Sequence, residues 1–363
     1  MFALPKGADL HVHLSGCGRG EDWVRCGEAV GMPGTRAERL EIRRPGPATA
    51  FFDEIVPTLT PWRKHPEVIL SVLELYLHRA LRENVGYAEI LTGPFGYRTA
   101  DAAVPVDYMV RRYRQILRRA QWGVRVHLLV NVARNAADVE DRLRRSAEFA
   151  ARHDDLWRGV QLSGVEEGDA DLVRLRDVYD GLALRFPKLG WAVHAGESSS
   201  APNAVRTALS LPVTRIGHAL GGAAYAEALR RGRVTVESSP ISNVMLGYVR
   251  SWEEHPLPSL LRSGVPVCLC TDNPGVWGAQ LTDEFFVAVQ FLHVTWSEVV
   301  EMTVRSIEAA FCVPEEKRVR LAAHVTAIER FVMVMEQWVV GAAEPPVPVV
   351  SPFALRHLAV PQG

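Results

Sequence analysis

Residues 8–14 read ADLHVHL, and they form the first of eight short segments that decide the fold. His11 and His13 alternate with apolar residues in this segment, which is the period-two pattern of a β-strand. Seven further strand-like runs follow along the chain: 86–92 (GYAEILT), 124–130 (VRVHLLV), 159–163 (GVQLS), 190–194 (GWAVH), 213–218 (VTRIGH), 233–238 (RVTVES) and 265–271 (VPVCLCT). Strands that alternate with helical patterns indicate βαβ units and a parallel sheet.

Helical patterns fill the spaces between these runs. Residues 104–121 can hold a helix, and the apolar residues at 68, 69, 72, 73, 76, 80 and 81 recur at helical spacing and are expected to face the sheet. After the eighth run, Thr295 and Glu298 form a possible capping box, and residues 316–340 predict one more long helix. Eight strands in this arrangement favour a TIM-type (β/α)8 barrel; an open doubly wound sheet is the competitor, but no GxGxxG follows the first run.

The barrel is expected to form one domain over residues 1–363 with two additions. Residues 15–66 make an unusually long first connection that contains Phe52, and an insertion after a strand's carboxyl end is a place where a barrel builds a lid. We therefore expect a lid there, with Phe52 in contact with substrate. Residues 342–363 are rich in proline and are expected to be extended, beyond the extra C-terminal helices.

Composition narrows the class of protein. The 41 basic and 42 acidic residues leave a net charge of -1, which argues against binding to nucleic acid or to anionic membrane. Five cysteines make a disulfide scaffold improbable and favour a reducing cytoplasm. We find neither a signal-peptide pattern nor an apolar run of membrane-spanning length. A small-molecule substrate is the expected partner, and the sequence gives no oligomeric state.

Chemically active residues gather where the runs end. His11 and His13 end the first run on one strand face, His194 ends the fifth, His218 ends the sixth, and Asp272 follows the eighth. In a barrel these carboxyl ends meet at one mouth, where catalytic groups lie. Three or four imidazoles with one carboxylate suit Zn²⁺ that keeps an open position for water.

The remaining histidines have plainer interpretations. Those in helical stretches (78, 153, 293 and 324) are expected to be structural or solvated, and His127 in mid-strand is expected to be packed. His65 and His255 are each followed by proline and lie in connections, and His65 could approach the site from the lid. Cys268 and Cys270 fit small buried apolar residues, and the basic run at 111–119 fits a solvated helix face.

Six motifs together resemble the adenosine deaminase family of zinc aminohydrolases. In order they are LHVHLSG (10–16), LSGVE (162–166), VHAGE (193–197), RIGHA (215–219), SSPISNVMLG (238–247) and TDNPGVWG (271–278). Their order and spacing agree with the family from about residue 4 to residue 312.

The resemblance assigns roles by position. It implies that one zinc ion per chain is bound by His11, His13, His194 and Asp272, and that the catalytic residues are Glu197, His218 and Asp272. Glu197 would protonate the ring nitrogen beside the amino-bearing carbon, and His218 would take a proton from the zinc-bound water and stabilise its charge. Gly164 would offer its backbone N–H to the purine. Supporting roles are implied for Glu237, Ser242 and Asn243.

Physical chemistry agrees with these roles. Zn²⁺ lowers the pKa of bound water to about 7, so hydroxide is present at neutral pH. Attack on a ring carbon puts charge on the neighbouring nitrogen, which calls for a protonated acid there. The net reaction replaces C–NH₂ with C=O and releases ammonia.

The substrate-reading positions depart from the family. Ser15 stands where the family has Asp or Glu, Asn273 replaces a second Asp, and Gln161 replaces another acidic residue. Arg19 could contact an acidic substituent, although a solvated loop arginine is the plainer interpretation. We therefore expect a deaminase of an adenosine-like or modified aminopurine. The alternatives are a deaminase of a non-nucleoside heterocycle or amidine, and a degenerate member that only binds a ligand.

Overall fold

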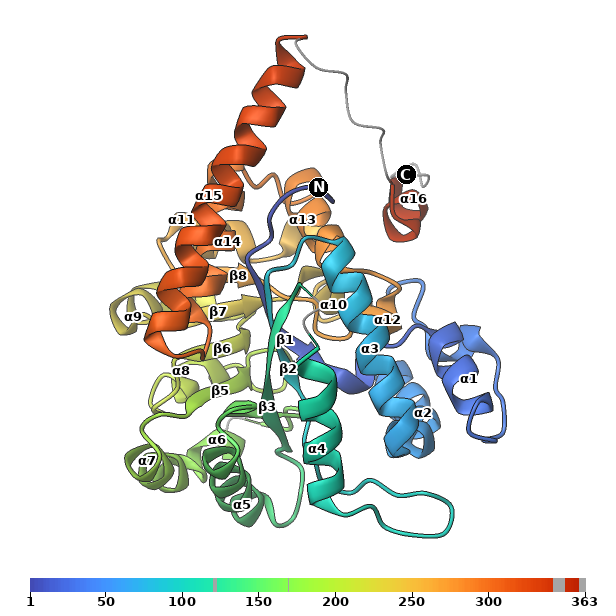
Figure 1. Cartoon of the computed structure of the whole chain (residues 1–363). Helices are drawn as coiled ribbons and strands as arrows, with labels where there is room; N and C mark the ends of the chain where they lie inside the picture. Colours follow the sequence, from blue (N-terminus) through green and yellow to red (C-terminus); the bar gives the residue numbers. More distant parts are fainter. Residues whose placement is uncertain (120–122, 169, 342–349, 359–363) are drawn as a thin grey trace.

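The computed structural model describes residues 1–119, 123–168, 170–341 and 350–358, and its centre is a ring of parallel strands (Figure 1). Eight strands lie in one sheet in chain order, each paired in parallel with the next. The predicted TIM-type barrel is therefore confirmed, and each strand overlaps its predicted run. The strands are β1 (Ala8–His13), β2 (Tyr87–Leu91), β3 (Arg125–Ala133), β4 (Trp157–Ser163), β5 (Gly190–Ala195), β6 (Arg215–His218), β7 (Thr235–Ser238) and β8 (Val267–Leu269).

The ring closes between its first and last strands just beyond β8. Val12 and Asp272 form a parallel bridge. The Asp272 backbone N–H donates to the His11 carbonyl and the His13 N–H donates to the Asp272 carbonyl, both at 2.8 Å. The same residues that close the barrel are those predicted to bind metal, so closure of the fold also assembles the site.

Helices cover the outside of the barrel. Those between successive strands are α3 (Pro66–Arg82), α4 (Val106–Leu117), α5 (Val139–Arg152), α6 (Ala170–Val173), α7 (Arg176–Arg185), α8 (Ala204–Ala208), α9 (Ala226–Gly232), α10 (Pro240–Met245) and α11 (Leu257–Arg262). The predicted inner face of α3 is buried except at Leu81, which is 43% exposed. No helix within the described residues is both long enough and apolar enough to span a bilayer.

The long first connection folds into α1 (Gly20–Glu28), a π-helical segment (Ala50–Ile55) and α2 (Val56–Arg63). Its chain crosses the segments that follow β7 and β8. The Ile42 N–H donates to the Val276 carbonyl, and the Phe51 ring lies 5.7 Å from the ring of Trp277. The connection therefore packs at the carboxyl ends of the strands, beside the mouth of the barrel.

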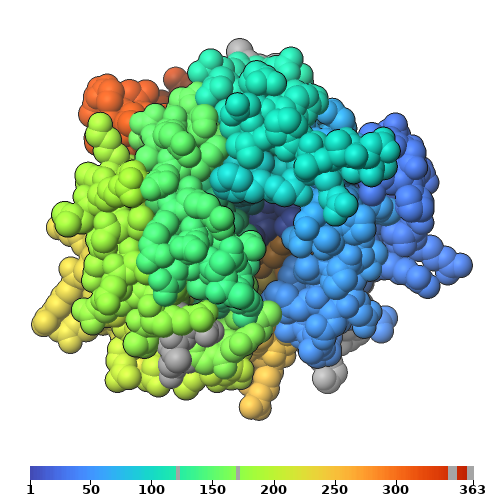
Figure 2. Space-filling view, turned by 90° about the horizontal axis from the view of Figure 1, so that it is seen from below, coloured from blue at the N-terminus to red at the C-terminus, as the bar shows by residue number. Residues whose placement is uncertain are grey.

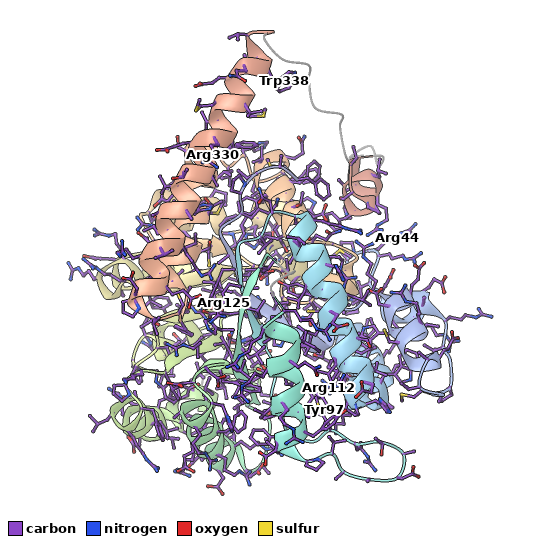
Figure 3. The ribbon with its side chains drawn as sticks, in the orientation of Figure 1. Arg44, Tyr97, Arg112, Arg125, Arg330 and Trp338 are labelled. Atoms are coloured by element: carbon purple, nitrogen blue, oxygen red, sulfur yellow. The ribbon has the colours of Figure 1, made fainter. Side chains whose placement is uncertain are left out.

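The chain after β8 adds α12 (Pro274–Trp277), α13 (Leu281–Gln290), α14 (Trp296–Ala309) and α15 (Pro314–Val339). The predicted capping box at the start of α14 is confirmed, because the Thr295 hydroxyl accepts from the Glu298 N–H and the Glu298 carboxylate accepts from the Thr295 N–H. The last turns of α15, where Trp338 lies, extend away from the barrel (Figures 1 and 3).

The tail differs from expectation in the part that is described. Residues 342–349 and 359–363 lie outside the described residues, but Pro352–Leu358 forms α16, whereas the sequence predicts an extended tail. A proline fits the first turn of a helix because that N–H has no helical partner. Phe353 is fully buried, and the Ser351 hydroxyl donates to Asp283 of α13. Docking against α13 therefore overrides the extended character of the proline-rich composition.

Candidate active site

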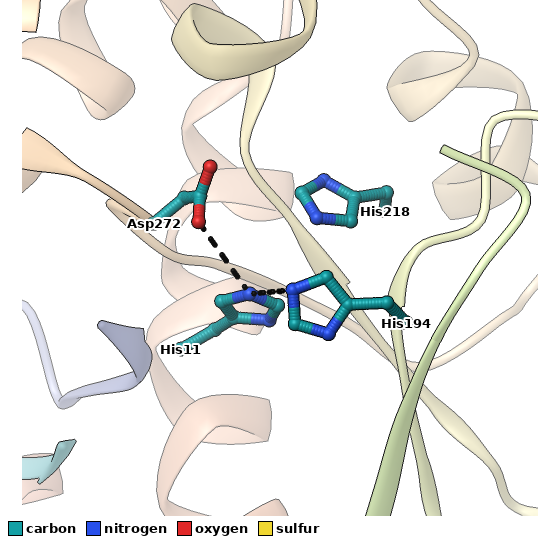
Figure 4. Close-up of side chains that lie close together, drawn as sticks. All are labelled: His11, His194, His218 and Asp272. Carbon is teal, nitrogen blue, oxygen red and sulfur yellow. Dashed lines mark hydrogen bonds and ion pairs between the residues drawn. The ribbon is translucent and has the colours of Figure 1, made fainter. Parts of the chain in front are cut away.

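Four predicted side chains converge at the mouth of the barrel, each from a different strand end (Figure 4). His11 Nε2 lies 3.0 Å from His194 Nε2 and 3.7 Å from Asp272 Oδ1. One ligand atom from each of His11, His194, His218 and Asp272 lies within 4.8 Å of all the others, and all four residues are buried. The cluster has the size and composition of a site for one metal ion.

His13 belongs to the same cluster, although it is the most exposed of these side chains. Its Nε2 lies 3.2 Å from His194 Nε2 and 3.4 Å from Asp272 Oδ1, and its side chain is 13% exposed. The structure therefore brings together all four predicted metal ligands, with His218 as a fifth candidate ligand beside them.

The electrostatics of the cluster suit a cation. Burial is the largest cause that holds the pKa of His11, His13 and His194 well below the usual range, so the imidazoles are neutral and keep lone pairs for a metal. The Ser242 hydroxyl donates to Asp272 Oδ2 at 2.6 Å, which leaves Oδ1 facing the histidines. Three imidazoles and a carboxylate match the donors that Zn²⁺ accepts.

A buried charge network orients His11 from behind. His11 Nδ1 donates to Glu237 Oε2 at 2.7 Å, which leaves Nε2 without a proton and directed at the cluster. Arg215 in turn lies between Glu237 (2.8 Å) and Glu89 (2.6 Å), and all three side chains are fully buried. Gln161 Nε2 donates to Glu237 Oε2 at 3.3 Å, so Gln161 joins this network behind the metal cluster.

A second chain of hydrogen bonds fixes the tautomer of His218. The backbone N–H of Leu257 can only donate, and it donates to His255 Nδ1 at 3.2 Å. His255 Nε2 then donates to Asn243 Oδ1, and Asn243 Nδ2 donates to His218 Nδ1 at 3.1 Å. The proton of neutral His218 is therefore on Nε2, a buried nitrogen that has no hydrogen-bond partner within the described residues.

Glu197 lies beside that free N–H. Its Oε1 is 3.6 Å from His218 Nε2. Burial, followed by the charge of Glu166, raises the pKa of Glu197 to about 8, against the opposing effect of Arg134. Glu166 is held by the N–H groups of Gly196 and Ser198, at 2.8 and 3.0 Å. At neutral pH Glu197 therefore carries a proton that it can donate.

The predicted substrate-binding residues lie around the same mouth but not together. Ser15 lines a cavity of about 530 Å³ over the ends of β1, β2 and β3. Gly164 directly follows β4 with φ of 105°, and an added Cβ would lie 2.7 Å from Asn135 Oδ1. Asn273 is the N-cap residue of α12 and packs against Gly16. Phe52 packs edge-on against Phe51 and is not among the residues that line the cavity. Arg19 lies near Asp283 of α13 and counters the rise in that carboxyl's pKa.

Several buried residues that support the site are not identified from the sequence alone. Glu89 is a carboxylate in the middle of an apolar strand, and Glu166 and Arg215 lie within the quoted motifs. Arg134 and His255 follow no local pattern, yet Arg134 donates to the His194 carbonyl and His255 holds Asn243. Their roles depend on partners from distant segments of the chain.

The plainer interpretations of other residues agree with the structure. His127 is buried and packs beside Tyr87, 3.0 Å from its hydroxyl. Cys268 and Cys270 are free and buried. The basic run on α4 is paired with nearby carboxylates, as in the contacts of Arg112 with Glu67 of α3 and of Arg114 with Asp155 in the turn before β4.

Comparison with known proteins gives one family. The model of the family described as adenosine deaminase matches residues 5–328. An adenine deaminase from Streptomyces coelicolor is 28% identical over 90% of this chain and 96% of its own length.

Two solved structures share the fold. One is an N6-mAMP deaminase from Arabidopsis (TM-score 0.72, 22% identity, 89% of this chain and 98% of that one). The other is an amidohydrolase from Burkholderia ambifaria with bound zinc (TM-score 0.74, 18% identity, 92% and 93%).

The family match covers the barrel, the metal-type cluster and the acid beside it. The motifs that carry the resemblance are thus the strand ends that build this site. The chain belongs to the adenosine deaminase family, and it is a metal-dependent aminohydrolase.

Proposed function

We propose that the protein hydrolyses the amino group of a purine or purine-like ring, replacing ring C–NH₂ with C=O and releasing ammonia. The observation that carries the proposal is the placement of a protonated carboxylic acid, Glu197, beside a buried cluster of imidazoles and one carboxylate. The family match and the names of its relatives, adenine deaminase and N6-mAMP deaminase, support an aminopurine as substrate.

Zinc is the metal that we propose, with His11, His13, His194 and Asp272 as its ligands. The donor set and the neutral state of the imidazoles support this choice. When bound, the ion would supply Lewis acidity that makes water nucleophilic at neutral pH.

Two of the chain's own residues then act on the reacting atoms, Glu197 with a proton and His218 with a hydrogen bond. Glu197 donates a proton to the ring nitrogen next to the carbon that is attacked, as a general acid does. His218 donates a hydrogen bond from its Nε2–H to the oxygen that adds to the ring and so stabilises the charge there, rather than taking a proton from water as the resemblance implies. The proton that the water loses would pass to solvent, and ammonia would take up a proton as it leaves. The hydrogen-bonded chain through Asn243 supports this donor role, whereas a base would need an unprotonated Nε2 at the start.

The substrate-binding surface is proposed to include Ser15, Gly164, Asn273 and Phe52, with residues 15–66 as a lid on a single-domain barrel. Packing of the first connection beside the mouth supports the lid. Ser15 and Asn273 differ from the acidic residues that the family has at these two positions, and this difference favours a modified aminopurine over adenosine itself. The five free cysteines support a reducing, cytoplasmic setting.

Replacing Glu197 with Gln tests the acid role. The amide keeps the shape of the side chain but has no transferable carboxyl proton, so kcat for ammonia release should fall by about 10²–10⁴-fold. Metal content, measured by inductively coupled plasma mass spectrometry, should equal that of the wild type.

Glu227→Gln on α9 makes the same change at an exposed carboxylate and should leave turnover unaltered. Retained turnover in the Glu197→Gln protein would contradict the role, and loss of metal from it would show that Glu197 acts structurally.

A further inference from the structure

A cavity of about 530 Å³ opens beside the metal cluster. Figure 2 looks into the mouth of the barrel, where a central hollow lies between the blue segment that contains α2 and the green segment that contains α5. The cavity is lined from the ends of β1–β3, from α3 and from those two helices. Its size is that of a small-molecule pocket.

The charge of this cavity is one-sided. Arg63 and Lys64 line it at the end of α2, and Arg142 and Arg145 line it from α5. Among the described residues that line it, none is acidic. Arg142 and Arg145 share a single carboxylate, Asp138, at 2.6 and 3.0 Å. Four cationic side chains therefore line the cavity, and Asp138 is the one carboxylate among the described residues that pairs with any of them.

Arg63 is the least exposed of these cations, and no anion among the described residues pairs with it. Its guanidinium is partly buried, its Nε has no hydrogen-bond partner, and its only described donation is to the Thr60 hydroxyl at 3.2 Å. No carboxylate within the described residues pairs with it. A desolvated guanidinium without an anion is costly, and its planar fork fits a phosphate or a carboxylate.

The cavity is next to the reaction centre. Ser15, two residues after His13, forms part of its wall. Burial is the main cause of the lowered pKa of His13, and the charge of Arg63 is among the smaller ones, so Arg63 lies within electrostatic reach of the cluster. A serine at position 15 also leaves the wall without a negative charge that would oppose an anion.

We propose that this cavity binds an anionic group of the substrate, a phosphomonoester or a carboxylate, through Arg63 and Lys64, with Arg142 and Arg145 adding to the positive field. The substrate is then an aminated heterocycle that carries such a group on its far side. This inference rests on the proposed function for the identity of the ring, but the charge preference of the cavity can be measured without turnover.

Calorimetric binding of matched products tests the inference. IMP, inosine and 9-(carboxymethyl)hypoxanthine present the same ring with a phosphate, no anion or a carboxylate. The metal-loaded protein should bind IMP or the carboxymethyl compound at least about tenfold more tightly than inosine, the effect of one or more charge-assisted hydrogen bonds. The preference should shrink as salt is raised. Which of the two anions binds more tightly identifies the group.

Two substitutions, Arg63→Gln and Lys64→Gln, should each weaken this preference; Lys64 is exposed, so its replacement should not disturb folding. The measured quantity is the dissociation constant of inosine divided by that of the anionic ligand, and it should fall by several-fold. Arg144→Gln is the matched control: it removes the same charge from α5 next to Arg145, but Arg144 pairs with Glu140 and Asp141 and does not line the cavity. Its ratio should equal that of the wild type.

Equal binding of all three ligands, binding of none, or a preference that survives both Arg63→Gln and Lys64→Gln would overturn the inference. Ammonia release is measured separately on AMP and adenosine. Turnover of both at the same kcat/KM, with no charge preference in binding, would refute the anion site and leave the proposed function standing. A charge preference in binding without any ammonia release would support the anion site and contradict the proposed function.

Discussion

His218 and Asp272 both adopt the left-handed backbone conformation, with φ of 66° and 57°. Such a conformation costs on the order of 1–3 kcal/mol for a residue with a side chain, so the surrounding contacts must hold it in place. Here they do, through Asn243 on His218 and through Ser242 and the β1 backbone on Asp272. The strained turns aim both side chains back over the barrel mouth.

Gly217 controls the position of the His11 ring. A Cβ at this position would lie 2.6 Å from His11 Cε1, well inside van der Waals contact. Gly217→Ala should therefore push the imidazole off the cluster, lower metal content below one ion per chain and cost roughly 1–3 kcal/mol of stability. Plasma mass spectrometry and urea denaturation measure the two effects.

Gly221→Ala is the control, because its added Cβ meets nothing within 4 Å and its φ is -81°. If Gly217→Ala bound metal as well as Gly221→Ala does, the predicted tight contact with His11 would be refuted.

The proton on His218 Nε2 depends on the amide of Asn243. An Asp at this position accepts but does not donate, so Asn243→Asp would draw a proton to His218 Nδ1 and leave Nε2 bare. We expect kcat to fall by about 10–100-fold with metal retained. Nitrogen-15 spectra of the imidazoles should show the change of tautomer, and an unchanged tautomer would argue against the chain through His255.

The metal cluster is the part of the site that the sequence predicts best. His11 and His13 alternate on a strand, and Asp272 follows the last strand run, so local pattern places them at one barrel end. His255 and Arg134 could not be found in this way. Each acts through a partner distant in the chain, as Arg134 does on His194, and no local pattern encodes that pairing.

At the scale of elements, α14 and α15 are joined by a buried polar contact. His324 Nε2 lies 2.9 Å from the Thr303 hydroxyl, and burial lowers the pKa of His324 to about 4. The imidazole is thus neutral in the folded protein, while an unfolded chain would take up a proton near pH 6.5. This pair therefore stabilises fully above pH 6.5 and loses its contribution as the pH falls toward 4.

His324→Gln keeps a hydrogen-bonding side chain but does not titrate. The stability of the wild type relative to this variant should fall by roughly 1–3 kcal/mol between pH 7 and pH 4, a range that allows for partial solvent screening. Urea denaturation at several pH values gives the difference. A difference that does not change with pH would show that His324 is not buried as a neutral group.

The strands and helices themselves were largely predictable because periodicity is local. Long α15 (Pro314–Val339) overlaps the helix predicted at 316–340, and the capping residues of α14 have the roles that their spacing indicates. The helix at Pro352–Leu358 was not predictable, because it depends on the burial of Phe353 and on the contact between Ser351 and α13.

For the whole molecule, net charge conceals the distribution that bears on function. The chain totals -1, and this balance gives no reason to expect a polyanion partner. It also hid a cavity that four cations line at the barrel mouth, because their positions come from α2 and α5, far apart in sequence. Only the closed barrel brings those segments together.

Ammonia release is the most direct test of the account as a whole. Three samples are assayed on AMP, N6-methyl-AMP, adenosine and adenine. The first is purified with zinc, the second is stripped of metal by a chelator, and the third is stripped and then restored with zinc. We predict that the first and the restored proteins release ammonia from at least one of these compounds and that the stripped protein releases none. Equal release by the stripped protein, or no release and no bound metal in any sample, would contradict a metal-dependent aminohydrolase.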